Sequence, residues 1–345
     1  MKLQLKLTVI AACILLHSSC RKNKETSNQE PDNLVYKSSC TTAEIYWLAD
    51  NETILLNDFC EGTLKQINTL TKSVQLFDLV ARGHLFQGIF YSEQLPHLAF
   101  YIALTRDATG AFSEPFKLFS LNLATGNSVL IRDSITQNPS SGGYIMGNKK
   151  LAIKSGSELL IINLEQATTQ ILPVSETVQA FSPDDTKMLI YSSSQGPITG
   201  ATVYDFVCQC TQPITLAGTS TGKPLWRTQG LYEYNINAAA ALNYSNLQSG
   251  IVLKSFPGFA EGPWVAQNGS LSILLSKGPT YATDEKGLLQ SFDFVSGQTK
   301  EIATALYIPF GFGIVGIYLA AVSPNQKKVA YVQNASDLRV TVLQP

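Results

Sequence analysis

The 345-residue chain is poor in the residue types that charged partners and many catalytic sites require. Only three residues are histidine, and Asp, Glu, Lys and Arg together make up 15% of the chain, with a formal net charge of −1. A nucleic-acid-binding surface needs a strongly basic face, so we expect no nucleic-acid partner. The sequence also lacks the Gly-rich P-loop that cradles phosphate groups, and we expect no cofactor.

Two histidines remain once an N-terminal leader is set aside, His84 and His97. They are 13 residues apart, without the His-x-x-x-His spacing of a helical metal site, and are most simply polar loop residues. Asp184, Asp185 and Asp205 occur where turns and strand ends are expected. The sequence therefore predicts neither a metal site nor a catalytic constellation, which favours a protein that is not an enzyme.

An apolar run near the N-terminus is too short to cross a membrane. Residues 1–19 have two lysines before an apolar core of about ten residues, Leu7–Leu16, which is typical of a cleavable signal peptide. The following Leu16-His17-Ser18-Ser19-Cys20 resembles the lipobox of bacterial lipoproteins, in the relaxed form of Bacteroidota. This resemblance implies cleavage before Cys20 and lipidation of that residue. An ordinary secretory signal followed by an incidental cysteine is the alternative.

Residues 20–33 are polar and have no hydrophobic periodicity, so we expect a flexible tether between the lipid and the folded domain. Several acyl chains on Cys20 would hold the protein at a membrane, because stable anchoring takes more than one chain. The resemblance to Bacteroidota lipoproteins implies the cell envelope. We expect the outer membrane, with the domain either periplasmic or surface-exposed.

The remaining chain carries a repeat built from short strands. In residues 180–192, an apolar strand ending at Phe181 precedes the turn sequence Ser182-Pro183-Asp184-Asp185 and a second apolar run. The same unit returns at residues 322–331, 141 residues later, and weaker copies occupy residues 146–153 and 48–56. The offset equals three periods of about 47 residues, and such a period in a chain of strands indicates a propeller or another repeat fold.

A second repeated feature marks a strand end in each repeat. An Asn or Asp precedes a hairpin turn at intervals of 41 to 54 residues. These positions are Asn68, Asn122, Asn163, Asp205, Asn246 and Asp293, and one further step along the chain ends near Asp337. Seven positions with a mean spacing of about 45 residues fit seven four-stranded blades. A β-sandwich with coincidental hairpins is the alternative, because strand and turn signals suit both folds.

The sequence Phe181-Ser182-Pro183-Asp184-Asp185, with the Lys187 that follows, resembles the WD40-like (PD40) repeat of TolB-type β-propellers, whose consensus is roughly Ser-Pro-Asp-Gly-Lys. The resemblance covers most of residues 34–345. Good copies lie at 181–192 and 322–332, and Asp185 or Gln326 stands where the consensus has Gly. It implies an all-β fold, with one β-propeller domain over residues 34–345, and it brings no catalytic residue.

The two ends of this domain are predicted to meet. The last strand, residues 338–343, would be the third strand of blade seven, and no further strand follows it. We therefore expect residues 34–36, directly after the tether, to supply the fourth strand of that blade. Closure of this kind removes exposed sheet edges, which would otherwise pair with other chains.

Four cysteines of the mature chain remain besides the lipidated Cys20, namely Cys40, Cys60, Cys208 and Cys210. They allow three disulfide pairings, of which we favour Cys40–Cys60 and Cys208–Cys210. Alignment of residues 205–211 with residues 293–299 puts the second pair at a hairpin turn, where the backbone bends and the sulfurs can meet. Structural staples or free thiols are favoured over a redox or metal site.

Aromatic residues at the beginnings of adjacent repeats are the best candidates for binding a partner. Trp226 and Trp264 stand at matching points of two repeats, and Tyr307 and Phe310 follow in a Gly-rich stretch one repeat later. Such rings would line one mouth of a propeller and stack on a glycan or clamp a peptide. Packing between blades is the alternative.

Two functional hypotheses follow. The first is a membrane-anchored extracytoplasmic lipoprotein whose propeller is a non-catalytic binding or scaffold module for a protein or glycan partner. The lack of catalytic constellations and the modest charge favour it. The second is an envelope enzyme of the polysaccharide lyase or glycosidase type, with its site in the central channel. A TolB-like accessory role in envelope maintenance rests on fold analogy alone.

Overall fold

The computed structural model describes part of the chain, all of it within one compact unit, Asn33–Pro345. The described residues are 33–39, 42–58, 62–135, 144–155, 158–172, 177–191, 201–214, 225–227, 230–235, 241–246, 249, 251–256, 259–265, 271–277, 286–293, 296, 298–306, 308–310, 313–315, 319–333 and 336–343. They form strands and turns, without a helix among them.

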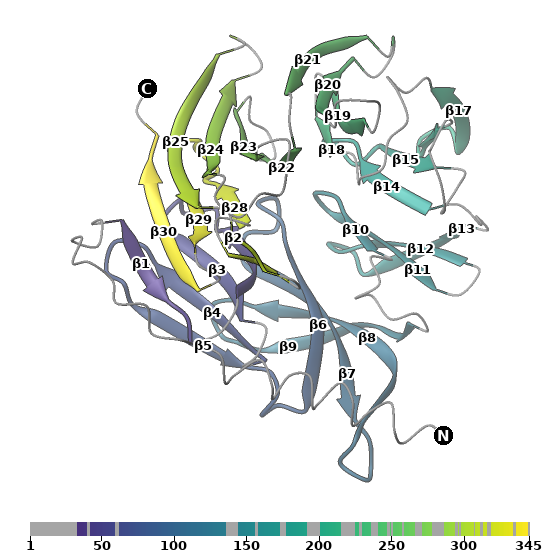
Figure 1. The fold of residues 1–345 in the computed structure, drawn as a ribbon. Helices are drawn as coiled ribbons and strands as arrows, with labels where there is room; N and C mark the ends of the chain where they lie inside the picture. The colour runs from purple at the N-terminus through teal and green to yellow at the C-terminus, as the bar shows by residue number, and fades with distance from the viewer. Residues whose placement is uncertain are drawn as a thin grey trace. The chain divides into compact units, whose positions relative to one another are not determined.

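Within these residues the strands form seven four-stranded antiparallel sheets, which we number in chain order, and one two-stranded hairpin (Figure 1). Sheet 1 contains β2 (Thr42–Trp47), β3 (Thr53–Asp58), β4 (Thr63–Asn68) and β5 (Val74–Asp78). Sheet 2 contains β6 (His84–Tyr91), β7 (Leu98–Arg106), β8 (Phe112–Asn122) and β9 (Ser128–Ile135). Sheet 3 contains β10 (Tyr144–Met146), β11 (Lys150–Ser155), β12 (Glu158–Asn163) and β13 (Thr168–Leu172).

The later sheets repeat this order. Sheet 4 contains β14 (Thr177–Phe181), β15 (Lys187–Tyr191), β16 (Ala201–Asp205) and β17 (Cys210–Ile214). Sheet 5 contains β18 (Leu225–Arg227), β19 (Gly230–Asn235), β20 (Ala241–Ser245) and β21 (Val252–Phe256). Sheet 6 contains β22 (Phe259–Val265), β23 (Leu271–Lys277), β24 (Lys286–Asp293) and β25 (Thr299–Leu306). After the hairpin of β26 (Ile308–Phe310) and β27 (Gly313–Val315), sheet 7 contains β28 (Leu319–Val322), β29 (Lys328–Gln333), β30 (Asp337–Val342) and β1 (Leu34–Lys37).

The central strands carry apolar residues on both faces because both faces are buried. In β3, Leu55 packs on residues of sheet 2, whereas Ile54 and Leu56 pack on sheet 7. In β7, Tyr101 faces sheet 1 and Phe100 faces sheet 3. Successive side chains of a strand point to opposite faces, so a strand packed between two neighbouring sheets needs apolar residues on both faces.

Apolar clusters connect the sheets in chain order. Separate clusters join sheets 1 and 2, 2 and 3, 3 and 4, and 4 and 5. Sheets 6 and 7 share a cluster that contains Leu289 and Val329, and sheets 7 and 1 share one that contains Trp47. Between sheets 5 and 6, β20 lies beside β22, and Lys254 Nζ is 5.7 Å from the centre of the Phe292 ring.

β1 is the fourth strand of sheet 7 although it comes from the other end of the domain. It pairs antiparallel with β30, so the pairing predicted for residues 34–36 is present (Figure 1). Just before β1, Asn33 Oδ1 accepts a hydrogen bond from Arg339 Nη1 at 3.0 Å. From sheet 1, Lys65 Nζ lies 5.3 Å from the centre of the Tyr36 ring. β1 is therefore held both by the other strands of its own sheet and by sheet 1.

Six of the seven predicted Asn and Asp positions end the third strand of a sheet or directly follow it. Asn122 shows their role, because its Oδ1 accepts the N–H groups of Ala124 at 3.0 Å and Thr125 at 2.9 Å. Bonds of the same kind close the turns that begin at Asn68, Asn163, Asp205, Asn246 and Asp293. The polar residue thus fixes the turn into the fourth strand.

The prediction for the seventh position, Asp337, was wrong. Asp337 begins β30 and pairs with Gln333 across the preceding hairpin. Sheet 7 has no turn from its third to its fourth strand, because its fourth strand is β1 from the start of the domain. There is consequently no turn for such a residue to close.

A chain that lacks residues 1–37 should be less stable than one that lacks only residues 1–30. The shorter chain loses β1, its ladder with β30 and the partly buried Val35 and Tyr36, which together should lower the free energy of unfolding by about 3 kcal/mol or more. Urea unfolding of both chains measures this difference. Equal unfolding midpoints would contradict a stabilising role of β1.

Candidate functional site

The repeated unit, Ser-Pro-Asp at 182–184 and Ser-Pro-Asn at 323–325, forms the turn between the first and second strands of sheets 4 and 7. Ser182 Oγ accepts the N–H of Lys187 at 2.9 Å, and the equivalent bond in sheet 7 has the same length. Asp185 and Gln326, at the consensus Gly position, have positive φ angles of 57° and 59°. Glycine accommodates a positive φ most easily, so another residue there needs a compensating contact.

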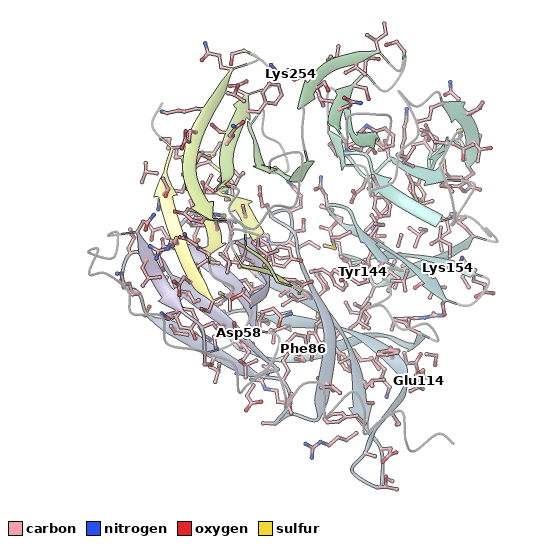
Figure 2. All side chains as sticks on the ribbon, in the orientation of Figure 1. Asp58, Phe86, Glu114, Tyr144, Lys154 and Lys254 are labelled. Carbon is pink, nitrogen blue, oxygen red and sulfur yellow. A yellow bond between two sulfur atoms is a disulfide. The ribbon has the colours of Figure 1, made fainter. Side chains whose placement is uncertain are left out.

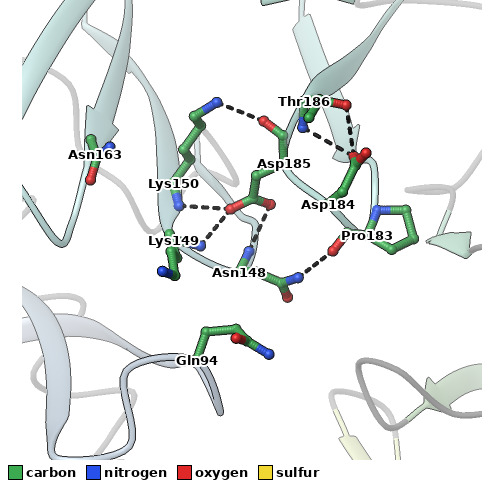
Figure 3. Close-up of a pocket in the computed structure, with 9 residues that line it drawn as sticks. All are labelled: Gln94, Asn148, Lys149, Lys150, Asn163, Pro183, Asp184, Asp185 and Thr186. Atoms are coloured by element: carbon green, nitrogen blue, oxygen red, sulfur yellow. Dashed lines mark hydrogen bonds between the residues drawn. The ribbon is translucent and has the colours of Figure 1, made fainter.

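Asp185 makes that contact with the neighbouring sheet. Its carboxylate accepts the N–H groups of Asn148 at 2.8 Å, of Lys150 at 3.1 Å and of Lys149 between them (Figure 3). Lys150 Nζ in turn donates to the Asp185 carbonyl at 2.6 Å. A Cβ atom at Gly147 would overlap Asp185 Oδ1, so glycine there lets the carboxylate approach. Asp185 therefore joins the turns of sheets 3 and 4.

Burial sets the electrostatics of this contact. Asp185 is 6% exposed, and burial raises the pKa of its carboxyl, while the three backbone bonds and the Lys150 charge oppose the rise. Burial likewise lowers the pKa of Lys150, against the opposing charges of Asp185 and Asp184. Lys150 Nζ also lies 4.0 Å from the centre of the Phe206 ring, within cation–π range. The two charges thus hold adjacent sheets together.

The same contact recurs between sheets 7 and 1. Asn51 has a φ of 61°, and its Oδ1 accepts the N–H of Asn325 at 2.7 Å. Lys328 Nζ donates to the Asn51 carbonyl at 3.1 Å. The weaker sequence copy at residues 48–56 therefore contains the same turn, and its polar residue at positive φ also bonds the preceding sheet.

A polar pocket of about 380 Å³ opens beside Asp185 (Figure 3). Its wall comes from three consecutive sheets, through the first turns of sheets 2, 3 and 4 and the end of β12. The lining residues are Gln94, Asn148, Lys149, Lys150, Asn163, Pro183, Asp184, Asp185 and Thr186.

Several lining groups have no hydrogen-bond partner in the described part of the chain. The side-chain amide of Gln94 makes no bond there, and Asn148 donates through Nδ2 to a backbone carbonyl but leaves Oδ1 open. Asp184 closes its own turn through Oδ1 and leaves Oδ2 open. Lys149 Nζ pairs with Glu165 Oε2 at 3.0 Å. The pocket thus has donors and acceptors that are free to bind a ligand, beside residues that are held by hydrogen bonds within the protein.

A second polar cluster lies where the first strands of sheets 1, 2 and 3 approach one another. Glu44 Oε2 accepts the Ile89 N–H at 3.2 Å and Asn57 Nδ2 at 3.0 Å, and Tyr46 Oη donates to the Ile89 carbonyl at 2.9 Å. Two of these bonds satisfy the N–H and the carbonyl of Ile89 in β6. Burial raises the pKa of the Glu44 carboxyl and that of Tyr46, and raises the pKa of Tyr144 (Figure 2) to about 12, with the Glu44 charge adding to both phenol shifts.

Of the four predicted aromatic candidates, only Trp226 has its side chain among the described residues. Trp226, on β18, is 7% exposed and packs with Leu189 and Val203 of sheet 4, which is the position that packing between blades requires. Trp264 and Phe310 belong to β22 and β26, but their side chains lie outside the described part of the structure. Tyr307 lies outside the described residues altogether. A binding role for these three stays a prediction.

Cys208 and Cys210 are joined by a disulfide, with their Cα atoms 5.3 Å apart. The bond spans the turn between β16 and β17, where Gln209 has a φ of 55°. Cys20, Cys40 and Cys60 lie outside the described residues, so the lipidation and the pairing expected for them stay predictions.

His84 was predicted to lie in a loop, but it begins β6. Its ring stacks on Phe119 with centroids 4.3 Å apart, and its Nδ1 lies 2.6 Å from Tyr101 Oη. Burial and the charges of nearby cations lower its pKa. His97 is an exposed turn residue before β7, as predicted. His84 therefore has a packing role between strands of sheet 2.

Sequence reasoning missed two features. Residues Gly218-Thr219-Ser220-Thr221-Gly222 match the Gly-x-Ser-x-Gly pattern of hydrolase elbows, but they lie outside the described residues. The pocket was missed because Gln94 belongs to a turn without the Ser-Pro-Asp motif. The described residues hold no cluster of three His, Cys, Asp or Glu side chains placed to bind a metal. In the same part of the chain, no helix has the length and hydrophobicity needed to cross a membrane.

No family model matches the chain, and no curated protein sequence matches it significantly. Among solved structures, an oligogalacturonate lyase in complex with manganese aligns with a TM-score of 0.61 at 11% identity, over 92% of this chain and 96% of that chain. The tricorn protease aligns with a TM-score of 0.55 at 13% identity, over 92% of this chain and 34% of that chain. Both are β-propellers, and at these identities the likeness shows that this chain has an all-β, propeller-like fold.

A structure described as TolB from Agrobacterium tumefaciens also aligns, over 90% of this chain and 93% of that chain at 12% identity. Its TM-score of 0.46 is too low to carry an argument. The resemblance to TolB-type propellers therefore rests on the Ser-Pro-Asp turns of the sequence.

Asp185→Gly should destabilise the protein although glycine suits the positive φ. The change leaves three backbone N–H groups without their acceptor and removes the carboxylate charge beside Lys150, so we expect a loss of about 2 kcal/mol in the free energy of unfolding. Asp185→Asn keeps one acceptor oxygen and should lose less. Urea unfolding compares the variants with the wild type. If Asp185→Gly unfolds at the same urea concentration as the wild type, relief of backbone strain offsets the loss of these bonds, and the bonds do not determine the stability at this position.

Glu44→Gln should change the pH dependence of stability. Because burial raises the pKa of Glu44 in the folded state, its contribution to stability is present below its ordinary pKa of 4.5 and is lost as the pH rises through the folded value. Gln keeps an acceptor for Asn57 and Ile89 but cannot ionise. At a pH above the folded-state pKa of Glu44, the variant should therefore melt at a higher temperature than the wild type. At about pH 4 the two proteins should melt alike. Parallel melting curves across pH would contradict this.

Proposed function

We propose that the chain is a lipid-anchored protein of the bacterial cell envelope whose β-propeller is a non-catalytic binding module for a protein or glycan partner. Residues 1–19 would be removed, Cys20 would carry the lipid in the outer membrane, and residues 20–33 would form the tether. The leader pattern and the lipobox-like residues before Cys20 support this placement.

The proposal includes a seven-bladed propeller closed by β1. Sheets 1 to 7 would be its blades, and two observations on the first and last of them support closure. β1 pairs with β30 inside sheet 7, and Trp47 Nε1 of sheet 1 donates to the Ala321 carbonyl of sheet 7 at 3.0 Å. A closed circle is the arrangement that gives each sheet a neighbour on both faces.

The observation that carries the binding role is the pocket at Gln94, Asn148 and Asp184. Its inner charges, Asp185 and Lys150, are bonded across two sheets, so the wall is held in place before any ligand arrives. The outer groups of the pocket remain open to a partner. A preformed concave wall with convergent polar groups is the usual form of a binding site.

An envelope enzyme is the alternative, and the likeness in fold to an oligogalacturonate lyase with bound manganese gives it a specific test. Purified protein is incubated with oligogalacturonate, with and without manganese, and unsaturated product is followed by ultraviolet absorbance. Product formed above the level of a heat-denatured control would overturn the non-catalytic assignment.

Cys20→Ser should move the protein from the membrane fraction to the soluble fraction and abolish incorporation of labelled palmitate, because no other residue would carry the lipid. Cys13→Ser, in the part of the leader that is removed, is the matched control and should behave as the wild type. Crosslinking of the wild type in native membranes, followed by mass spectrometry, tests for a protein partner. A membrane-bound, unlabelled wild type would contradict the anchor.

A further inference from the structure

We propose that the pocket lined by Gln94, Asn148 and Asp184 binds a neutral saccharide. The inference rests on the proposed binding role and narrows its ligand from a protein or glycan to one chemical class. It is argued from the charge balance, the open hydrogen-bonding groups and the size of the pocket.

All but one of the charged groups around the pocket are engaged within the protein. Lys149 is paired with Glu165 at 3.0 Å, and Lys150 is bonded to the turn of Asp185, whose carboxylate accepts three N–H groups. The open charged atom is Asp184 Oδ2. An acidic ligand would face this oxygen without a free cation to receive it, and a strongly cationic ligand would face two lysines. A neutral ligand meets neither penalty.

The open groups suit hydroxyls. Asn148 Oδ1 and Asp184 Oδ2 are acceptors, and the Gln94 amide offers both a donor and an acceptor. A sugar hydroxyl donates and accepts at once, so neighbouring hydroxyls on one ring can satisfy such a mixed set. The pocket wall is made of amide, hydroxyl and charged side chains with Pro183, whereas protein interfaces depend on buried aromatic or arginine anchors.

The size and construction of the pocket fit the end of an oligosaccharide. Its volume of about 380 Å³ lies in the lower part of the range for small-ligand sites. The three open groups come from the first turns of sheets 2, 3 and 4, and Asp185 bonds two of these turns together. Asn148 and Asp184 therefore keep their spacing without a ligand, which lowers the entropic cost of binding.

The test uses the full mature chain and a panel of neutral malto-, cello-, laminari- and manno-oligosaccharides, with oligogalacturonate as the acidic comparison. Binding is measured by saturation-transfer NMR and isothermal titration calorimetry. Gln94→Ala removes an exposed amide, and Asp184→Asn keeps the turn acceptor while replacing Oδ2 with an amide donor. Gln75→Ala, an exposed glutamine on β5 outside the pocket, is the matched control. Thermal melting verifies that each variant is folded.

We expect at least one neutral oligosaccharide to bind, with Gln94→Ala and Asp184→Asn each weakening it about tenfold or more and Gln75→Ala leaving it unchanged. The inference is overturned if no neutral oligosaccharide binds, if oligogalacturonate binds more tightly, or if both pocket variants bind like the wild type. A crosslinked protein partner found alongside any of these failures would leave the binding module standing and remove only its saccharide ligand. Absence of both would remove the binding module as well.

Discussion

Sheets 1 to 4 of this protein each have two apolar faces, and each of these faces is covered by another sheet. The strands of sheets 1 to 4 show the consequence most clearly, because successive residues such as Ile54 and Leu55 pack on different neighbours. A face left open would expose apolar area at a cost of about 25 cal/mol per Å². The same constraint explains the position of β1. This strand completes sheet 7, next to sheet 1, although β1 lies about 300 residues before its partner strand β30 in the chain.

Turns do more in this fold than reverse the chain. Asn or Asp at the end of a third strand closes a turn within its own sheet, whereas Asp185 and Asn51 reach into the preceding sheet. The second role explains a departure from the propeller consensus. Glycine would satisfy the positive φ of Asp185, but only a side chain with acceptor oxygens can also bind the N–H groups of the neighbouring turn. Sheet order is thus fixed by polar bonds at the turns as well as by apolar packing.

Local chemistry was predictable from the sequence, and contacts between sheets were not. Positions such as Asn122 were found because the Asx turn is contained within a few residues. Asp337 was misplaced because the spacing of the repeat was extended to sheet 7, whose third strand has no turn into a fourth strand, although the strand that completes this sheet was itself predicted. His84 was assigned to a loop because its stacking on Phe119 is a contact across strands. The one sequence feature that could have pointed to the pocket was Asp185, which places a carboxylate where the repeat consensus has glycine.

The candidate site follows from this architecture. Bonding adjacent turns consumes Asp185 and Lys150, which are the charges that a catalytic or ionic site at this point would use, and it leaves amides and one carboxylate oxygen at the rim. Burial of Asp185 further disfavours its free charge, which its backbone partners offset. A wall whose charges are neutralised by its own backbone can recognise a ligand by hydrogen-bond geometry. The turns of the repeat that build the fold thereby also determine which kind of ligand the pocket can recognise.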